Sequence, residues 1–462
     1  MRLSCFMLIG NTDRGGDPFG GAKISLNEGA PTAVVRGASG HPFTQAKTRR
    51  NALRSAPSLH VVHSGADPSA SPKMRSSDIS LGERKMPISL TRRTVLGAML
   101  APAIIRPTLG HAAEPIRLGA ILSATGPGAG VGLPQRNGVL LAVKAINEKG
   151  GIAGRPIELL VEDDGSNPDA AVTKANNLIF SQKVKAIIGP TLTASTLSVG
   201  GVADPEKIAV MPFTGLGLEM EKQRRSVFHM LPTQDLNARA LLEFVTKNMK
   251  TRKVAVLHDS AYGNIVMTKL KEVNATYNVD FVATEKWEVG ATDVTTQAAK
   301  IKATAPDVVL VIGNSATPFR NLRQIRMNAP LMSALGTASY EYVRAMGDAA
   351  DNIIFAEFLV AEDPLPYQKD FVETFHKEYD TFPKTMEASA WDAVHAVAAG
   401  IAKAGPDATP AAISDAIRGP YAGAMAKFDF SAPDLTGLSL SNYVYSKLEK
   451  GKFTRVPFTA GQ

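Results

Sequence analysis

Short apolar runs alternate along the chain with segments whose apolar residues recur every three or four positions. The apolar runs predict buried strands at 116–122, 157–161, 186–189, 208–211, 253–257, 308–312 and 353–358. Between them, amphipathic spacing and helix-capping residues predict helices that begin near residues 139, 169, 195, 264, 292 and 319. Apolar strands separated by helices are typical of parallel sheets covered on both faces. Because the alternation restarts at Lys253, we expect two doubly wound α/β lobes.

The first 113 residues differ from the rest in charge and composition. The chain of 462 residues has a net charge of +8, but residues 1–113 hold 15 Lys and Arg against 6 Asp and Glu, whereas the remainder hold 36 against 37. The remainder therefore has no electrostatic reason to bind nucleic acid. It also lacks cysteine, since the only one is Cys5, and so can form no disulfide. Residues 1–85 are rich in Gly, Ser, Pro and Arg without periodicity, and we expect a disordered or non-native extension.

Residues 86–113 follow the pattern of a secretory signal peptide. They contain two arginines (Arg92 and Arg93), an apolar run at 95–105 and small residues at the end. We expect translation to begin at the methionine that opens this segment, and the mature protein to be periplasmic. The arginine pair leaves Sec-type and twin-arginine export both open. A membrane anchor is the alternative, and it is disfavoured because the apolar run falls well short of the ~20 residues that span a bilayer.

Motifs that define common enzyme classes are missing. The sequence has no G-x-S-x-G, Walker A or H-E-x-x-H motif. The glycine-rich loop predicted at 125–132 contains Pro127, which removes a backbone donor that a phosphate would need, so an ordinary turn is favoured over a phosphate site. His258 and Asp259 are adjacent on a predicted strand, so their side chains point to opposite faces and cannot pair in a triad. We therefore expect a binding protein rather than an enzyme, with no cofactor and no metal.

Two loops of small and hydroxyl residues follow predicted strands, at 191–196 and 212–215. In an open α/β sheet, ligands bind beyond the carboxyl ends of the strands. Hydroxyl groups and the free N–H groups of a helix N-terminus suit a carboxylate. We expect Thr193 to contact the ligand. For Ser195, a ligand contact and a simple helix-capping role are equally open.

Several short motifs occur in a fixed order over residues 115–462. They are IRLG at 116–119, TGP at 125–127, INEKGGIAG at 146–154, DD at 163–164, IGP at 188–190, HD at 258–259, YG at 262–263 and LRQ at 322–324. Together they resemble the leucine/isoleucine/valine-binding proteins, which are periplasmic solute receptors of branched-chain amino-acid ABC transporters. The resemblance implies a type I periplasmic-binding fold, with two α/β lobes joined by three crossover strands that close over a solute. It implies permease and ATPase subunits as partners.

The resemblance also implies how the chain divides into two lobes. Separately, we expect the protein to be a monomer. Lobe one would comprise 114–232 and 363–425, and lobe two 233–362 and 426–462, with crossovers near Pro232, Ala361 and Ala426. A ligand sensor that uses the same fold to dock on a signalling or transcriptional partner is the alternative function.

Matching the family residue by residue implies a ligand site. Thr193 falls where the family places a hydroxyl on the ligand carboxylate. Phe213, Thr214 and Gly215 fall where it offers backbone and hydroxyl contacts. Tyr262 matches a tyrosine of the second lobe that closes over the ligand.

The sequence departs from the family's amino-acid binders at three positions. Val131 replaces a tyrosine of the first glycine-rich loop, Asn314 replaces another aromatic residue, and Leu335 replaces the acid that pairs with the ligand ammonium. Because a buried ammonium without an anion is costly, these departures predict a small, mostly apolar carboxylate without an α-amino group. The alternative is that Asp259 or Glu341 takes the vacated place and restores amino-acid binding.

Overall fold

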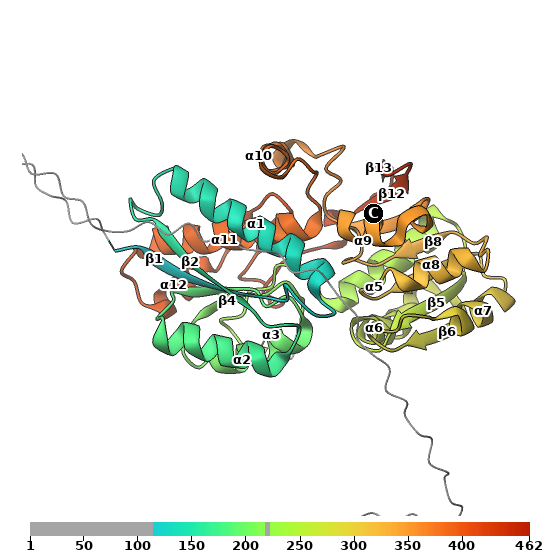
Figure 1. The fold of residues 1–462 in the computed structure, drawn as a ribbon, viewed down its shortest axis with the longest axis horizontal. Helices are drawn as coiled ribbons and strands as arrows, with labels where there is room; N and C mark the ends of the chain where they lie inside the picture. Colours follow the sequence, from blue (N-terminus) through green and yellow to red (C-terminus); the bar gives the residue numbers. More distant parts are fainter. Residues whose placement is uncertain (1–113, 218–221) are drawn as a thin grey trace, which may run out of the picture. The chain divides into compact units, whose positions relative to one another are not determined.

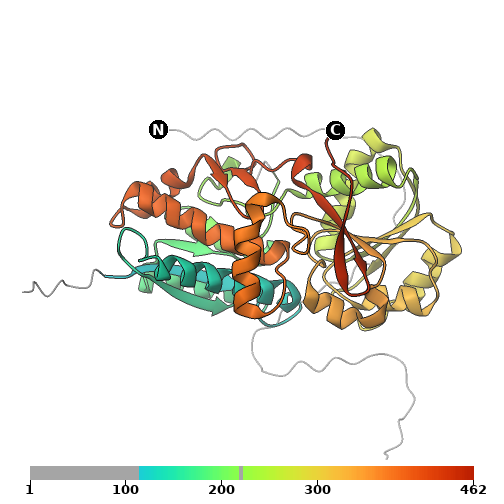
Figure 2. The ribbon, with the colours of Figure 1, turned by 90° about the horizontal axis from the view of Figure 1, so that it is seen from above.

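The computed structural model describes residues 114–217 and 222–462. These residues lie within one compact unit, Ala101–Gln462. The extension expected at 1–85 and the signal peptide expected at 86–113 lie outside the described residues. Figures 1 and 2 show two β-sheets with helices packed against them.

The first sheet has four parallel strands in the order β2-β1-β3-β4. The strands are β1 (Ile116–Leu122), β2 (Ile157–Asp163), β3 (Ala186–Ile188) and β4 (Ala209–Met211). Strand β1 is buried at every position except one, and β3 and β4 are buried throughout, as expected of strands covered on both faces. The predicted strands of this sheet are thus confirmed within a few residues.

The second sheet has seven strands in the order β13-β12-β9-β8-β7-β5-β6. The strands are β5 (Lys253–Asp259), β6 (Asp280–Trp287), β7 (Val308–Ile312), β8 (Leu331–Ser333), β9 (Ile353–Glu357), β12 (Val444–Glu449) and β13 (Lys452–Val456). Strands β5 to β9 pair in parallel, whereas β12 runs antiparallel to β9 and to β13. The strands predicted for this sheet pair in parallel, and β12 and β13 add an antiparallel edge that was not predicted. The tight turn at Lys450 and Gly451, both with positive φ, makes β12 and β13 antiparallel to each other, because a short hairpin can join only antiparallel strands. A small separate pair, β10 (Pro420–Ala422) and β11 (Lys427–Asp429), completes the described strands.

Helices flank both sheets. They are α1 (Ala129–Glu148), α2 (Pro168–Asn176), α3 (Thr193–Ala203), α5 (Gln234–Glu243), α6 (Tyr262–Tyr277), α7 (Thr295–Ala303), α8 (Thr317–Gln324), α9 (Tyr340–Met346), α10 (Lys369–Tyr379), α11 (Thr385–Ala404) and α12 (Pro410–Ile417). Short π-helical turns at Asn177–Ser181 and Phe244–Asn248 extend α2 and α5. Short 3-10 turns occur at Gly347–Ala350, Pro366–Gln368 and Leu440–Asn442.

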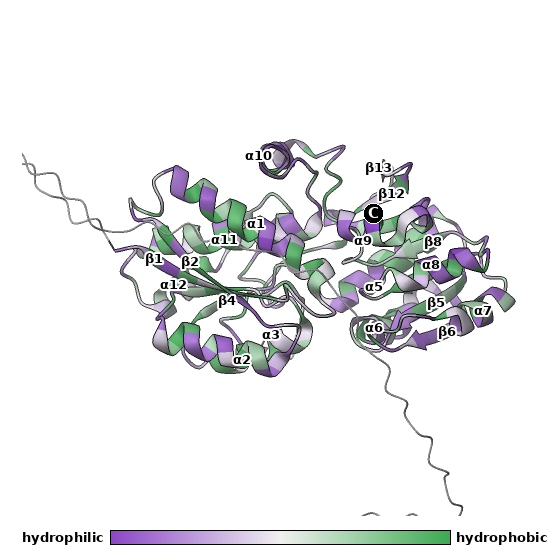
Figure 3. Cartoon of the chain, in the orientation of Figure 1, coloured by the Kyte–Doolittle hydropathy of each residue, from purple (hydrophilic) through white to green (hydrophobic). Residues whose placement is uncertain are grey.

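The first sheet is covered by helices from two distant stretches of chain. Helix α1 packs along α11 on one face, and α2 packs along α3 on the other (Figure 1). Figure 3 shows hydrophobic and hydrophilic residues alternating along α1 and α2, and the apolar positions of α1, such as Val139, Ala142 and Ile146, are buried. The lobe bounds and the crossovers proposed near Pro232, Ala361 and Ala426 stay predictions.

The six predicted helix starts differ from the structure by one to ten residues, and the first three show why. Helix α1 already includes Ala129, inside the segment predicted as a glycine-rich loop. Helix α2 is capped by Asn167, whose Oδ1 accepts from the N–H groups of Asp169 and Ala170 at 2.8 and 3.2 Å, because Pro168 occupies the first helical position. Helix α3 begins at Thr193, two residues before the predicted start.

Candidate functional site

A cavity of about 850 Å³ lies beyond the carboxyl ends of strands from both sheets. Its walls come from the segments that follow β1, β3 and β4 of the first sheet and β5, β6, β7 and β8 of the second. Binding beyond the strand ends is the rule for open α/β sheets. The volume lies toward the upper end of the ~300–1,000 Å³ usual for small-molecule sites.

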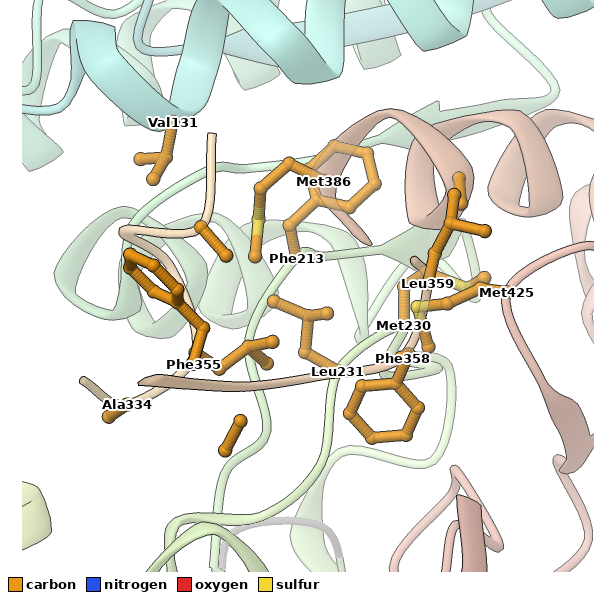
Figure 4. Packing of buried hydrophobic residues seen from close by; sticks show 14 of the residues in the cluster. Val131, Phe213, Met230, Leu231, Ala334, Phe355, Phe358, Leu359, Met386 and Met425 are labelled. Atoms are coloured by element: carbon orange, nitrogen blue, oxygen red, sulfur yellow. The ribbon is translucent and has the colours of Figure 1, made fainter. Parts of the chain in front are cut away.

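Seven of the nine predicted site residues line this cavity. They are Val131, Thr193, Phe213, Thr214, Tyr262, Asn314 and Leu335. Figure 4 shows three apolar residues of the cavity wall, Phe213, Leu231 and Met386, grouped together from three separate parts of the chain. The other two predicted residues, Ser195 and Gly215, are absent from the lining.

Ser195 is committed to the fold. Its Oγ donates to Asp164 Oδ2 at 2.8 Å, and Ser123 Oγ donates to the other oxygen of the same carboxylate at 2.7 Å. Ser195 is buried, and these bonds tie the start of α3 to the ends of β1 and β2. Of the two roles left open for Ser195, the structure favours the structural one, although its partner is a carboxylate and not the helix backbone.

Gly215 lies where two backbone segments approach each other. A Cβ at this position would lie 2.2 Å from the carbonyl oxygen of Pro232. The Gly215 carbonyl accepts from Gln234 Nε2 at 3.4 Å. This close approach explains why the position is a glycine, and the expected ligand contact of Gly215 stays a prediction.

The first-lobe wall offers hydrogen-bond donors but no cation. Thr193 is the first residue of α3, and the preceding Leu192 gives no side-chain cap, so among the described residues no side chain accepts from the N–H groups of this first turn. The Thr214 hydroxyl donates to Thr196 Oγ1 at 3.2 Å, and the Thr214 carbonyl bonds to His229 Nδ1 at 2.7 Å. Thr193 is thus the hydroxyl of this wall that has no protein partner within 114–217 and 222–462.

Asp259 is the only acidic or basic residue among the described residues that line the cavity. Its Oδ1 accepts from the N–H groups of Ala261 at 3.0 Å and Gly263 at 2.6 Å, and its Oδ2 accepts from the N–H of Asn314 at 3.2 Å. Burial raises the pKa of the Asp259 carboxyl despite these three donors. The side chain joins the loops after β5 and β7. Glu341, the other acid considered as a replacement, does not line the cavity.

Sequence reasoning missed Trp287 and Gln135, which also line the cavity. Trp287 is the last residue of β6 and is buried. Gln135 Oε1 accepts from Thr191 Oγ1 at 2.7 Å, and this hydroxyl in turn accepts from the N–H of Ser123. A tryptophan at a strand end was the available signal, but β6 itself was not predicted.

The two aspartates at the end of β2, Asp163 and Asp164, form hydrogen bonds that stabilise the fold. Asp163 accepts from the N–H groups of Ala124, Thr125 and Gly165, and these bonds hold the pKa of its carboxyl below the usual range although burial opposes them. Within 114–217 and 222–462, no three His, Cys, Asp or Glu side chains are grouped to hold a metal ion. Over the same residues, no helix is both long and apolar enough to cross a bilayer.

The chain is similar to periplasmic solute-binding proteins over most of its described length. The family model for periplasmic binding proteins matches residues 115–443. A Leu/Ile/Val-binding protein of Rhizobium johnstonii is 27% identical over 373 residues, which are 79% of this chain and 99% of that protein.

Two solved structures share the fold. The branched-chain amino acid transporter substrate-binding protein of Streptococcus pneumoniae, in complex with isoleucine, has a TM-score of 0.67 and 22% identity over 74% of this chain and all of its own. An ABC transporter solute-binding protein of R. palustris, in complex with benzoate, has a TM-score of 0.66 and 21% identity over 74% of this chain and 95% of its own. These likenesses confirm the predicted fold class, two α/β lobes of the type I periplasmic-binding fold. The family consists of extracytoplasmic substrate-binding proteins and not of enzymes. This chain belongs to the periplasmic binding protein family, among the relatives of the leucine/isoleucine/valine-binding proteins.

Proposed function

We propose that the protein is the solute receptor of a branched-chain amino-acid-type ABC importer and binds a small, largely apolar carboxylate between its two lobes. The observation that carries this proposal is the cavity. It is lined by both sheets' loops, it has an open helix N-terminus on one wall, and it holds a single charged side chain among the described residues.

The solute carboxylate would bind at the start of α3. The N–H groups of the first turn lack side-chain acceptors, and the partial positive charge of a helix N-terminus favours an anion there. Thr193 adds a hydroxyl donor at the same place. The apolar body of the solute would then lie against Val131, Phe213 and Met386, which are all buried.

An α-ammonium group finds little support in the same cavity. Leu335, which stands where the family has an acid, is buried and can accept no hydrogen bond. Asp259 already accepts three backbone N–H groups. Isoleucine and benzoate, the ligands of the two structural neighbours, share a carboxylate and an apolar body and differ in the ammonium. We assign the shared part to this protein.

The partners and location follow from the same proposal. The receptor would act as a monomer in the periplasm, reached through a Sec-type or twin-arginine signal peptide, and would deliver its solute to the permease and ATPase subunits of the importer. Genes for two permeases and two ATPases beside this one would support import, whereas a neighbouring histidine kinase would support the sensor alternative.

Calorimetry with matched ligand pairs tests the ligand class. Leucine is compared with 4-methylpentanoate, and phenylalanine with 3-phenylpropionate, so that each pair differs only in the α-amino group. We expect the deaminated acids to bind at least as tightly as the amino acids. An amino acid that binds more than about tenfold tighter, ~1.4 kcal/mol, would contradict the assignment and favour Asp259 as the ammonium partner.

A further inference from the structure

Several neutral polar side chains line the second-lobe wall of the cavity, and three of them are both unexposed and without a partner among the described residues. They are the indole N–H of Trp287, the side-chain amide of Asn314 and the hydroxyl of Tyr262. Within residues 114–217 and 222–462, none of these three groups has a hydrogen-bond partner. Burial and the charge of Asp259 raise the pKa of the Tyr262 hydroxyl above its usual range, so it stays a protonated donor.

Trp287 is the most informative of the three. Trp287 is only 2% exposed overall, but its N–H is not one of the fully buried polar atoms that lack a partner, so solvent in the cavity reaches it. The indole can only donate a hydrogen bond. A solute that displaces this solvent must therefore supply an acceptor, because a donor left unsatisfied on binding is costly.

The position of the indole is defined by its neighbours. Trp287 lies opposite Asp259 in the pairing of β6 with β5. A Cβ on Gly313, at the end of β7, would lie 2.6 Å from Trp287 Cζ2 and 2.5 Å from Asp259 Oδ2. The glycine thus leaves the space that seats the indole beside the Asp259 carboxylate.

The charge of Asp259 and the donor of Trp287 limit which chemical group of a bound solute can lie against this wall. An anionic group would be repelled by Asp259. An ammonium group would be attracted to Asp259 but could not accept from Trp287, and the indole donor would stay unsatisfied. A hydroxyl or carbonyl oxygen accepts from Trp287 or Asn314, and a hydroxyl can also donate to Asp259.

We propose that Trp287 and Asn314 form a distal subsite, on the wall opposite Thr193, that binds an uncharged oxygen at the far end of the solute. The solute would then be a hydroxylated or oxo-substituted carboxylic acid whose apolar middle spans the cavity. This inference rests on the proposed function, since it takes the carboxylate to lie at the start of α3.

The two tryptophans of the chain, Trp287 and Trp391, allow a direct test. Trp391 packs against Phe371, with ring centroids 5.3 Å apart, and does not line the cavity. Trp391→Phe therefore leaves Trp287 as the single tryptophan and serves as the matched control for Trp287→Phe. The probes are 3-phenylpropionate, its three ring-hydroxylated isomers and its 4-aminomethyl derivative. Affinity is measured by calorimetry and by tryptophan emission.

We expect at least one hydroxylated isomer to bind about tenfold tighter than the parent acid in the wild type and in Trp391→Phe. Its binding should shift the emission of Trp287. In Trp287→Phe the preference should fall to about twofold or less, because the ring is kept and the N–H is lost. Asn314→Leu is a second variant with the same expectation, so the test does not depend on one variant folding.

Three results would overturn the subsite. The parent acid could bind as tightly as every hydroxylated isomer, both variants could keep the full preference, or the aminomethyl derivative could bind tightest. If no carboxylic acid of any class binds the wild type, the proposed function itself fails. The two failures are therefore distinguishable.

Discussion

Thr193 tests the placement of the carboxylate most directly. Because its hydroxyl has no protein partner within the described ranges, Thr193→Ala removes a donor without disturbing a hydrogen bond of the fold. Loss of a hydrogen bond to a charged group should cost roughly 1.5–3 kcal/mol, about a 10- to 150-fold rise in Kd. Thr173→Ala, an exposed threonine of α2 outside the cavity, is the control. Unchanged solute affinity in Thr193→Ala would mean that the carboxylate binds elsewhere.

Ser195 should behave in the opposite way. Its hydroxyl donates to the buried Asp164 carboxylate, so Ser195→Ala leaves that acceptor short of a donor. We expect the free energy of unfolding to fall by roughly 1–3 kcal/mol. The solute Kd should stay within about twofold, because the lost hydrogen bond lies in the fold. Urea denaturation and calorimetry on the same preparation measure both quantities, and a weakened affinity at full stability would return Ser195 to the ligand site.

At the scale of single residues, the sequence predicted the residues of the first-lobe wall of the cavity better than those of the second-lobe wall. Thr193 and Phe213 closely follow apolar strands, and the family resemblance marked them. Trp287 could not be found in this way, because four of the eight residues of β6 are polar and only its last position is buried. The hydrogen bonds by which Asp259 joins the loops after β5 and β7, from the N–H groups of Gly263 and Asn314, are also invisible without the fold.

At the scale of elements, most buried strands were predictable, although the three-residue β8 was missed, and the helix starts were not. Strands such as β1, β7 and β9 are apolar nearly throughout because both faces are covered. The start of α1 was missed because its first turn contains Gly130 and Gly132, which are typical of loops. The C-terminal β12–β13 hairpin was missed although the Lys450-Gly451 turn between its strands is a local signal for a hairpin.

Gly132 explains why glycine is tolerated in that helix. A Cβ there would lie 2.0 Å from the carbonyl oxygen of Ser123. Gly132→Ala should therefore lower the thermal midpoint, even though alanine is the better helix former by roughly 1 kcal/mol. Gly201→Ala in α3 is the matched control, because its Cβ would meet only the Arg224 side chain at 4.0 Å. There the midpoint should rise. A stabilised Gly132→Ala would show that the first turn of α1 does not pack against β1 as described.

For the whole molecule, two buried carboxyl groups should make stability depend on pH. Asp392 of α11 accepts from the N–H groups of Ala424 and Met425 at 2.6 and 2.7 Å, and burial raises its pKa to about 7. Glu387, also of α11, accepts from the N–H of Lys384 at 3.0 Å. Burial, and after it the charge of Glu341, raises the pKa of Glu387 to about 8, although Lys384 opposes this shift.

Whether the free energy of unfolding rises or falls with pH follows from the direction of these pKa shifts. A carboxyl whose pKa is higher in the folded state stabilises the fold fully below its unfolded pKa, near 4, and this contribution is lost as the pH rises toward the folded pKa. Each such group should lower the free energy of unfolding by up to about 1.4 kcal/mol per pH unit over that interval. The buried His229, whose pKa burial lowers to about 4, acts in the opposite sense only below pH ~6.5.

We therefore expect the free energy of unfolding to fall between pH 6.5 and about 8 and to level off above that, as Asp392 and then Glu387 lose their protons. Glu387→Gln keeps an acceptor for the Lys384 N–H but cannot ionise. The slope of the free energy of unfolding against pH should therefore become shallower by up to about 1.4 kcal/mol per pH unit, the contribution of one proton. Glu373→Gln, an exposed position of α10, should leave the slope as in the wild type. Urea denaturation at half-unit pH steps measures the slope for all three proteins. Stability that stays flat or rises over this interval would mean that Glu387 and Asp392 are already ionised in the folded protein, paired with cations or with water that enters the α11 region.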